Sequence, residues 1–165
     1  MRTSLNSRSA YRFGRPLLLA LSIAATSTSC LNLNVDGPDS QPSDPAHETF
    51  AAGLHVDISS MKRTPSGVYY KDGPLGSGPA FTGLGTLTIS FVGYLKTGAL
   101  FQQGDGVQIV LGNEIVGLQE GLQGMLPGGE RLIVIPSALG FGATLTGTVP
   151  PNSTLVYDVV LQSVP

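Results

Sequence analysis

Residues 107–161 read VQIVLGNEIVGLQEGLQGMLPGGERLIVIPSALGFGATLTGTVPPNSTLVYDVVL, and their pattern decides the fold. The stretch contains strand-like runs at 107–111, 131–135 and 155–161, which are separated by segments rich in glycine and proline. Alternation in the last run predicts one shared face for Leu155, Tyr157, Val159 and Leu161. We therefore expect a strand at each of these three runs, with another element between the first run and the second.

That element is predicted to be a short helix, because the spacing of apolar residues changes to three and four. The apolar stripe consists of Ile115, Leu118, Leu122 and Met125. Asn113 is placed to act as the N-cap, and the segment 127–129 ends the helix. Glycines within the helix weaken its intrinsic propensity, so packing of the stripe against the sheet must hold it, and the same glycines permit a close approach.

The segment 86–91 alternates polar and apolar residues, which predicts a strand with Leu87, Ile89 and Phe91 on its buried face. The alternation indicates a sheet that is covered on one side only. Gly98 can adopt the positive φ of a tight hairpin turn, after which residue 100 begins the return strand. Antiparallel strands around one crossing helix predict an α+β fold, and the 22 glycines and 12 prolines are typical of a turn-rich sheet protein.

Several groups of residues, taken in this order, resemble the FKBP-type peptidyl-prolyl isomerases. They are LG at 111–112, GLQEG at 117–121, MLPGGER at 125–131, FGA at 141–143 and PPNSTLVYDVVL at 150–161. The resemblance extends upstream through SGVYYKD and TLTISFVGYLKTGALF, so that it covers residues 64–165. It implies a twisted antiparallel sheet that curls around one short helix, with a pocket between them.

The resemblance also implies the residues of the pocket. Those implied to be catalytic are Phe101, Ile115, Phe141 and Tyr157, with the backbone N–H of Ile115 binding the substrate carbonyl. Those implied to bind the substrate are Phe91, Gln102, Val107, Glu114, Leu118 and Val149. The chain departs from the family pattern at several of them, since Gln102 replaces an aspartate, Leu118 a tryptophan, Phe91 and Phe141 tyrosines, Val107 a phenylalanine and Glu114 a valine. We expect a pocket that keeps its apolar walls but loses polar contacts.

The residues of this domain offer no constellation for hydrolysis, because His47 and His55 both precede residue 64 and no cysteine follows Cys30. Prolyl isomerisation needs no nucleophile, metal or cofactor. Its barrier of about 20 kcal/mol arises from amide resonance and falls when the imide is twisted in an apolar site. We therefore expect an isomerase that assists the folding of exported proteins and acts on unfolded or proline-containing polypeptides.

Two other classes of function are open to this pattern. A non-catalytic polypeptide-binding chaperone module would use the same groove, and the departures at Gln102, Leu118 and Phe141 favour it. A structural envelope protein of the sandwich type would show the same strand alternation. It would not explain the order of FGA, the helix stripe and PPNSTLVYDVVL.

The segment 1–29 has the pattern of a secretory signal peptide, with four arginines before an apolar run at 16–25 and no acidic residue before Asp36. The run is too short to span a bilayer as a stable helix. Cys30, the single cysteine, follows the small residues 27–29, which is similar to the lipidation site of bacterial lipoproteins. The similarity implies a lipid anchor on Cys30 in the cell envelope. Because Leu31 rather than an aspartate follows, we expect the outer membrane, although an ordinary cleaved signal with a free thiol is the alternative.

Residues 30–63 are predicted to form a flexible tether, since the part after Cys30 is rich in Pro, Asp, Ser and Asn. Leu54, Val56, Ile58 and Met61 could form a short amphipathic helix that packs on the domain or on a partner. The formal net charge of −2 and the scattered basic residues argue against nucleic acid as a partner. We expect a monomer or weak dimer that contacts the membrane through the lipid anchor.

Overall fold

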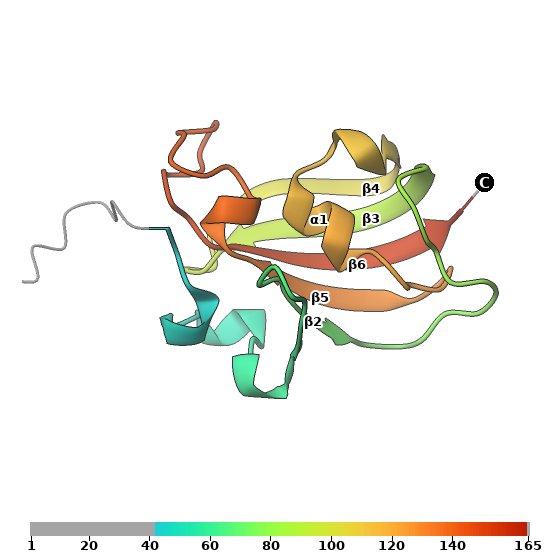
Figure 1. The fold of residues 1–165 in the computed structure, drawn as a ribbon, viewed down its shortest axis with the longest axis horizontal. Helices are drawn as coiled ribbons and strands as arrows, with labels where there is room; N and C mark the ends of the chain where they lie inside the picture. The colour runs from blue at the N-terminus through green and yellow to red at the C-terminus, as the bar shows by residue number, and fades with distance from the viewer. Residues whose placement is uncertain (1–41, 165) are drawn as a thin grey trace, which may run out of the picture. The chain divides into compact units, whose positions relative to one another are not determined.

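The computed structural model of the chain describes residues 42–164 (Figure 1). Within this range the strands form a six-stranded antiparallel sheet in the order β1-β2-β5-β6-β3-β4. The strands are β1 (Lys62–Arg63), β2 (Tyr69–Asp72), β3 (Thr86–Leu95), β4 (Leu100–Val110), β5 (Glu130–Ile135) and β6 (Leu155–Ser163). The α-helix α1 (Val116–Gly121) lies across one face of the sheet (Figure 1). The predicted α+β fold is confirmed.

The described part of the chain also contains short 3-10 helices. They are η1 (Pro45–His47), η2 (Ala52–Leu54), η3 (Ile58–Ser60), η4 (Leu111–Asn113) and η5 (Ser137–Leu139). None of the helices in residues 42–164 is long and apolar enough to cross a membrane.

The hairpin between β3 and β4 forms as predicted. Gly98 has a φ of +86°, and its N–H donates to the Leu95 carbonyl oxygen at 2.9 Å. The separate strand predicted at 107–111 is instead the end of the long strand β4, and Leu111 begins η4. The glycine at the turn therefore predicted the hairpin correctly. The apolar run at 107–111 did not show that it continues the return strand that begins at residue 100.

The main core lies between the sheet and α1. Alternate residues of β6 contribute to it as predicted, and their side chains are buried: Leu155, Tyr157, Val159 and Leu161. Leu87 and Ile89 of β3 are also buried there, while Phe91 is half-buried against the same cluster. The alternation of apolar residues therefore predicted this face of the sheet correctly.

The helix α1 begins later than predicted. Its N-cap is Ile115 rather than Asn113, because residues 111–113 form a 3-10 turn in which the Glu114 N–H donates to the Leu111 carbonyl oxygen at 3.1 Å. The Ile115 carbonyl then accepts the first bonds of α1, from the N–H groups of Leu118 and Gln119. The N-cap prediction is wrong because residue 113 still belongs to the 3-10 turn and lies two residues before the N-cap.

The predicted apolar stripe nevertheless faces the sheet. Leu118, Leu122 and Met125 are 5%, 0% and 3% exposed, although Leu122 already caps the helix and Met125 lies beyond it. Gly117 and Gly121 allow the close approach, since an added Cβ would lie 2.2 Å from Cγ2 of Ile135 and 2.7 Å from Cγ2 of Ile133. This contact positions α1 directly over β5.

The opposite face of the sheet carries a second apolar cluster. Val134, Val156 and Tyr69 from the sheet are buried there beneath side chains of the segment 50–61, namely Phe50, Leu54, Val56, Ile58 and Met61. The expectation of a sheet covered on one side only is therefore wrong for this region. The segment packs as irregular chain with the turns η2 and η3, not as the α-helix considered from its sequence.

Polar contacts also attach the chain before residue 64 to the sheet domain. Ser43 and Ser137 exchange hydrogen bonds, each N–H donating to the other's Oγ, at 2.9 and 2.7 Å. Lys96 Nζ pairs with Glu48 Oε1 at 2.9 Å. The packed unit thus includes residues that the sequence assigned to the tether at 30–63, and its described part begins near Ser43. The predicted signal peptide at 1–29 and Cys30 lie outside the described residues.

Candidate active site

A pocket of about 240 Å³ opens on the helix side of the sheet. Six of the predicted site residues line it: Phe91, Gln102, Val107, Glu114, Leu118 and Tyr157. They come from β3, β4, β6, α1 and the turn before α1, so segments far apart in the sequence meet here. The lining is mostly apolar, with Gln102, Glu114 and the Tyr157 hydroxyl as polar groups.

Three further residues line the pocket and were not predicted to belong to the site: Ile89, Ile109 and Val159. Strand alternation could have identified them, because Ile89 and Val159 were already assigned to the buried faces of their strands, and Ile109 shares the parity of Val107 on β4.

Four aromatic rings lie in a row along this side of the sheet. The Tyr157 ring meets Phe101 edge-on, with centroids 5.6 Å apart, and Phe91 at 6.0 Å. Phe101 in turn meets Phe141 edge-on at 6.4 Å. Phe101 and Phe141 therefore do not line the 240 Å³ pocket itself but extend its aromatic wall toward the loop that follows β5.

Glycine makes room for this row. Gly93 of β3 lies opposite Tyr157 of β6 and Gln102 of β4. An added Cβ at Gly93 would lie 2.9 Å from Cζ of Phe101 and 3.1 Å from Cε1 of Tyr157. The absence of a side chain thus permits both rings to lie over the strand.

The remaining two predicted residues, Ile115 and Val149, do not line the pocket. Ile115 is half-buried at the start of α1, and its backbone N–H makes no hydrogen bond within the described part of the chain. Val149 is 2% exposed and packs in the main core, where its backbone pairs with Thr146. Ile115 therefore offers a free backbone donor next to Glu114 of the pocket, whereas Val149 is a core residue.

Tyr157 remains a neutral phenol over the physiological range. Burial raises the pKa of Tyr157 well above its ordinary value of 10.0, and the negative charge of Glu114 adds to the shift. Its hydroxyl donates a long hydrogen bond of 3.5 Å to Oε1 of Gln102. This loose contact leaves the hydroxyl available as a donor to a bound polar group.

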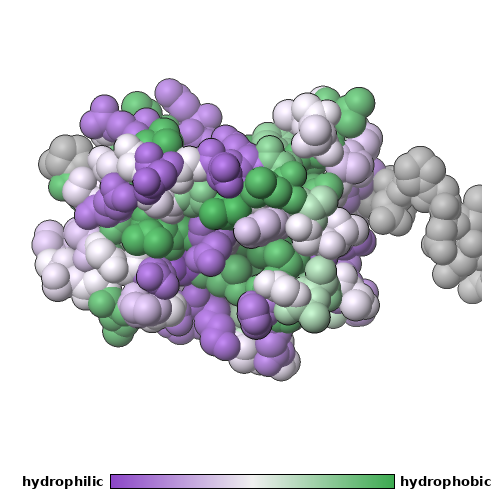
Figure 2. Space-filling view, turned by 180° about the vertical axis from the view of Figure 1, so that it is seen from behind, coloured by the Kyte–Doolittle hydropathy of each residue, from purple (hydrophilic) through white to green (hydrophobic). Residues whose placement is uncertain are grey.

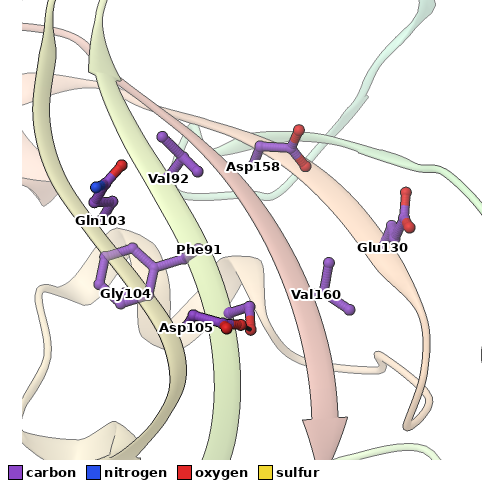
Figure 3. Close-up of a pocket in the computed structure, with 9 residues that line it drawn as sticks. Phe91, Val92, Gln103, Gly104, Asp105, Glu130, Asp158 and Val160 are labelled. Atoms are coloured by element: carbon purple, nitrogen blue, oxygen red, sulfur yellow. Dashed lines mark hydrogen bonds between the residues drawn. The ribbon is translucent and has the colours of Figure 1, made fainter.

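A larger and more open hollow of about 600 Å³ lies on the other face of the sheet (Figure 3). The carboxylates of Asp105, Glu130 and Asp158 surround it, and Figure 2 shows hydrophilic and hydrophobic residues mixed over this side of the molecule. Asp105 is already engaged, since Ser90 Oγ donates to its Oδ1 at 2.6 Å. Of the predicted site residues only Phe91 borders this hollow, so we assign the candidate site to the smaller, aromatic pocket.

Comparison with known proteins agrees with this geometry. The family model described as FKBP-type peptidyl-prolyl cis-trans isomerase matches residues 80–162, which include the whole candidate pocket and all of β3 to β6 except the last residue of β6. The chain belongs to this family. The FKBP-type resemblance noted in the sequence is thereby confirmed at the level of the family.

Individual relatives are identical to this FKBP-type chain at about a third of the aligned residues. A "Probable FKBP-type peptidyl-prolyl cis-trans isomerase" of Haemophilus influenzae is 36% identical over 120 residues, which are 70% of this chain and 48% of that protein. FkpA of Buchnera aphidicola subsp. Schizaphis graminum, also described as an FKBP-type peptidyl-prolyl cis-trans isomerase, is 30% identical over 66% of this chain and 45% of its own length. The chain thus spans about half the length of these curated relatives.

Solved structures of similar proteins have the same fold. FkpA from Escherichia coli superposes with a TM-score of 0.59 at 33% identity, over 62% of this chain and 50% of that one. A peptidyl-prolyl cis-trans isomerase from Pseudomonas syringae pv. tomato superposes with a TM-score of 0.61 at 28% identity, over 68% of this chain and 85% of that one. The twisted antiparallel sheet with one short helix is therefore the family fold.

Proposed function

We propose that the chain is a peptidyl-prolyl cis-trans isomerase that acts on proline-containing segments of polypeptides. The observation that carries this proposal is the apolar pocket between sheet and helix, walled by Phe91, Val107, Leu118 and Tyr157, in a member of the FKBP-type family. Such a pocket suits a reaction that makes and breaks no covalent bond. The rate of this reaction depends on the resonance of one amide.

The pocket lowers the barrier by desolvation. The planar imide is stabilised by charge separation between nitrogen and oxygen, and water solvates that form better than an apolar wall does. A prolyl ring against Tyr157 and Leu118 would lose this solvation, while the twisted transition state, with less charge separation, would lose less. The walls therefore favour the transition state over both planar isomers.

Two donors can hold the substrate in the pocket. The Ile115 N–H, unpaired within the described residues, can bind the carbonyl of a substrate residue beside the pocket. The Tyr157 hydroxyl, neutral and only loosely bonded to Gln102, can bind a second carbonyl. One net hydrogen bond contributes about 1 kcal/mol, so these contacts fix orientation while the apolar walls supply most of the effect.

A non-catalytic polypeptide-binding module is the second candidate. Gln102 and Leu118 line the pocket at the positions where the family resemblance implies an aspartate and a tryptophan. A site without these groups would still accept a prolyl segment through its apolar walls. If the missing aspartate and tryptophan are needed for turnover, the site would bind such a segment but isomerise it slowly or not at all.

Refolding of a client whose slow phase is X-Pro isomerisation separates the two candidates. Uncatalysed exchange takes on the order of tens of seconds, so a catalyst is visible directly in that phase. An isomerase at substoichiometric concentration should shorten it. Suppressed aggregation with an unchanged slow phase would favour the binding module instead.

We further propose that the protein is exported and held in the bacterial envelope by a lipid on Cys30, where it assists the folding of exported proteins. Support comes from the arginine-rich start, the short apolar run and the small residues before Cys30. A tether after the anchor would let the packed unit, whose described part begins near Ser43, reach polypeptides away from the bilayer.

A further inference from the structure

Glu114 is the one ionisable carboxyl group that lines the aromatic pocket within residues 42–164. Its backbone is fixed on both sides, because its N–H donates to the Leu111 carbonyl at 3.1 Å and its carbonyl accepts from Gln119 Nε2 at 2.7 Å. Its side chain is half-buried, and its carboxylate forms no hydrogen bond or ion pair in this part of the chain. The structure thus holds an unneutralised negative charge at the pocket wall.

Among residues 42–164, no basic side chain lines the pocket to offset this charge. Arg131 is the single basic residue from 97 to 164, and it is 5% exposed. Its guanidinium is occupied by Asp72 and by the carbonyl oxygens of Gly121 and Gln123, all within 2.7 Å. Lys96, just before this range, pairs with Glu48.

The field of Glu114 reaches the centre of the site. Together with burial it raises the pKa of Tyr157, whose ring forms part of the apolar wall. A charge at the border of an apolar wall is screened less than one on an open surface, so it acts on any charged group of a bound peptide. The effect is attraction for a cation and repulsion for an anion.

We infer that Glu114 is a specificity-determining residue, which makes the pocket prefer prolyl segments that carry lysine or arginine next to the proline. This inference rests on the proposed isomerase function, because it concerns the substrate of the same pocket. A basic side chain beside the prolyl ring would pair with the Glu114 carboxylate while the ring occupies the apolar wall. A glutamate or aspartate in the same place would meet the uncompensated charge and bind less well.

The test compares peptides that differ only in the residue before proline: lysine, glutamine and glutamate. Catalysed cis-trans exchange, measured by NMR without a coupling protease, should be fastest for the lysine peptide and slowest for the glutamate peptide. We expect the lysine and glutamine peptides to differ in kcat/KM by roughly two- to fivefold, as for a partly exposed ion pair. The difference should shrink as salt is raised, because salt screens the pair.

Two variants test whether the charge of Glu114 causes the difference in kcat/KM between the peptides. Glu114→Gln should bring the lysine and glutamine peptides to the same kcat/KM, whereas Glu130→Gln removes the same charge from the opposite face and should leave their ratio as in the wild type. A wild-type ratio near one, or a preference that survives in Glu114→Gln, overturns the inference.

Failure of the isomerase proposal is distinguishable from failure of this inference. If no peptide exchanges faster than the uncatalysed background, the isomerase proposal fails. Chemical-shift titration with the same peptides then still measures their Kd values. Tighter binding of the lysine peptide that disappears in Glu114→Gln supports the role of Glu114 in a binding pocket. Equal Kd values for the three peptides contradict it.

Discussion

The ring of Phe101 meets the ring of Tyr157 edge-on, with centroids 5.6 Å apart and ring planes at 88°. The two rings lie over Gly93, which has no side chain to separate them. Phe101 is partly buried and borders the pocket, while Tyr157 is 2% exposed and belongs to the core. The pair therefore joins the wall of the site to the body of the protein.

We predict that Phe101→Ala abolishes measurable isomerisation and leaves cooperative unfolding intact. The substitution removes the ring that supports Tyr157 and carries the aromatic wall to Phe141, yet it leaves the buried strand β6 in place. Exchange rates and denaturant melts measure the two effects. Val160→Ala, on the opposite face, is the matched control and should keep the activity. Wild-type rates in Phe101→Ala would show that this ring is only packing.

We predict that Leu122→Ala costs more stability than Leu118→Ala. Leu122 is fully buried, so its truncation should lower the free energy of unfolding by roughly 2 to 4 kcal/mol through lost burial and a residual cavity. Leu118 lines the open pocket, where water can enter the space that the side chain leaves. Denaturant melts of the two variants provide the comparison. Equal losses would mean that the pocket floor behaves as closed core.

Gly117→Ala should be strongly destabilising although alanine favours helices. The new Cβ would lie 2.2 Å from Cγ2 of Ile135 and would push α1 away from β5. Gly124→Ala meets no atom within 4 Å but has a φ of +75°, so its cost should come from backbone strain alone. Thermal melts compare the cost of Gly117→Ala in the wild-type protein with its cost in Ile135→Ala protein, which lacks the Cγ2 atom that the new Cβ would meet. A smaller cost in the Ile135→Ala background is expected only if the steric contact dominates.

The ion pair between Asp72 and Arg131 should make stability depend on pH. Burial raises the pKa of Asp72, but hydrogen bonds from Lys62 and Arg131 and their charges outweigh it, so the pKa lies below the ordinary 3.8. A carboxyl with a lowered pKa stabilises the fold above the unfolded-state pKa, and this contribution is lost as the pH falls through the folded-state pKa.

Asp72→Asn should therefore be less stable than the wild type at neutral pH, by about 1 to 3 kcal/mol, because it weakens the pairing of the buried Arg131. The difference should narrow as the pH falls below 3.8, where the unfolded chain takes up the proton, and should be smallest below the lowered folded-state pKa, where the folded wild-type carboxyl also loses its charge. Urea melts between pH 2 and pH 7 measure it. A difference that stays constant over this range would contradict a role for the charge.

The anchor proposal predicts that Cys30→Ser loses an acyl mass and leaves the membrane fraction. Cys30 is the single cysteine, so no other thiol can carry the modification. Intact-mass analysis and fractionation of cells that express both forms provide the measurement. Wild-type protein recovered without lipid from the soluble fraction would defeat the proposal.

Much of the sheet could be predicted because its strands obey a simple period. Leu87 and Ile89 on β3, and Tyr157 and Val159 on β6, follow the alternation that places a side chain on one face. The alternation does not show which part of that face the short helix leaves uncovered. This is why Ile109, which has the same parity as Val107, was not recognised as a pocket residue.

The packing of the segment 50–61 could not be predicted from the spacing of its apolar residues. The apolar residues of this segment pack on the sheet through irregular chain and 3-10 turns, and their spacing of four, two, two and three residues follows no single period of helix or strand: Phe50, Leu54, Val56, Ile58 and Met61. Their shared face depends on the shape of the sheet beneath them. The N-cap at residue 113 failed for a related reason, since a 3-10 turn before α1 displaced the start of the helix.

The most direct test of the central claim is the cis-trans exchange rate of a proline tetrapeptide, followed by NMR with catalytic amounts of the purified chain. We predict exchange above the uncatalysed background for the wild type, and background exchange for Phe101→Ala protein that still unfolds cooperatively. Background exchange for the wild type at high micromolar concentration, with the fold intact, would contradict it.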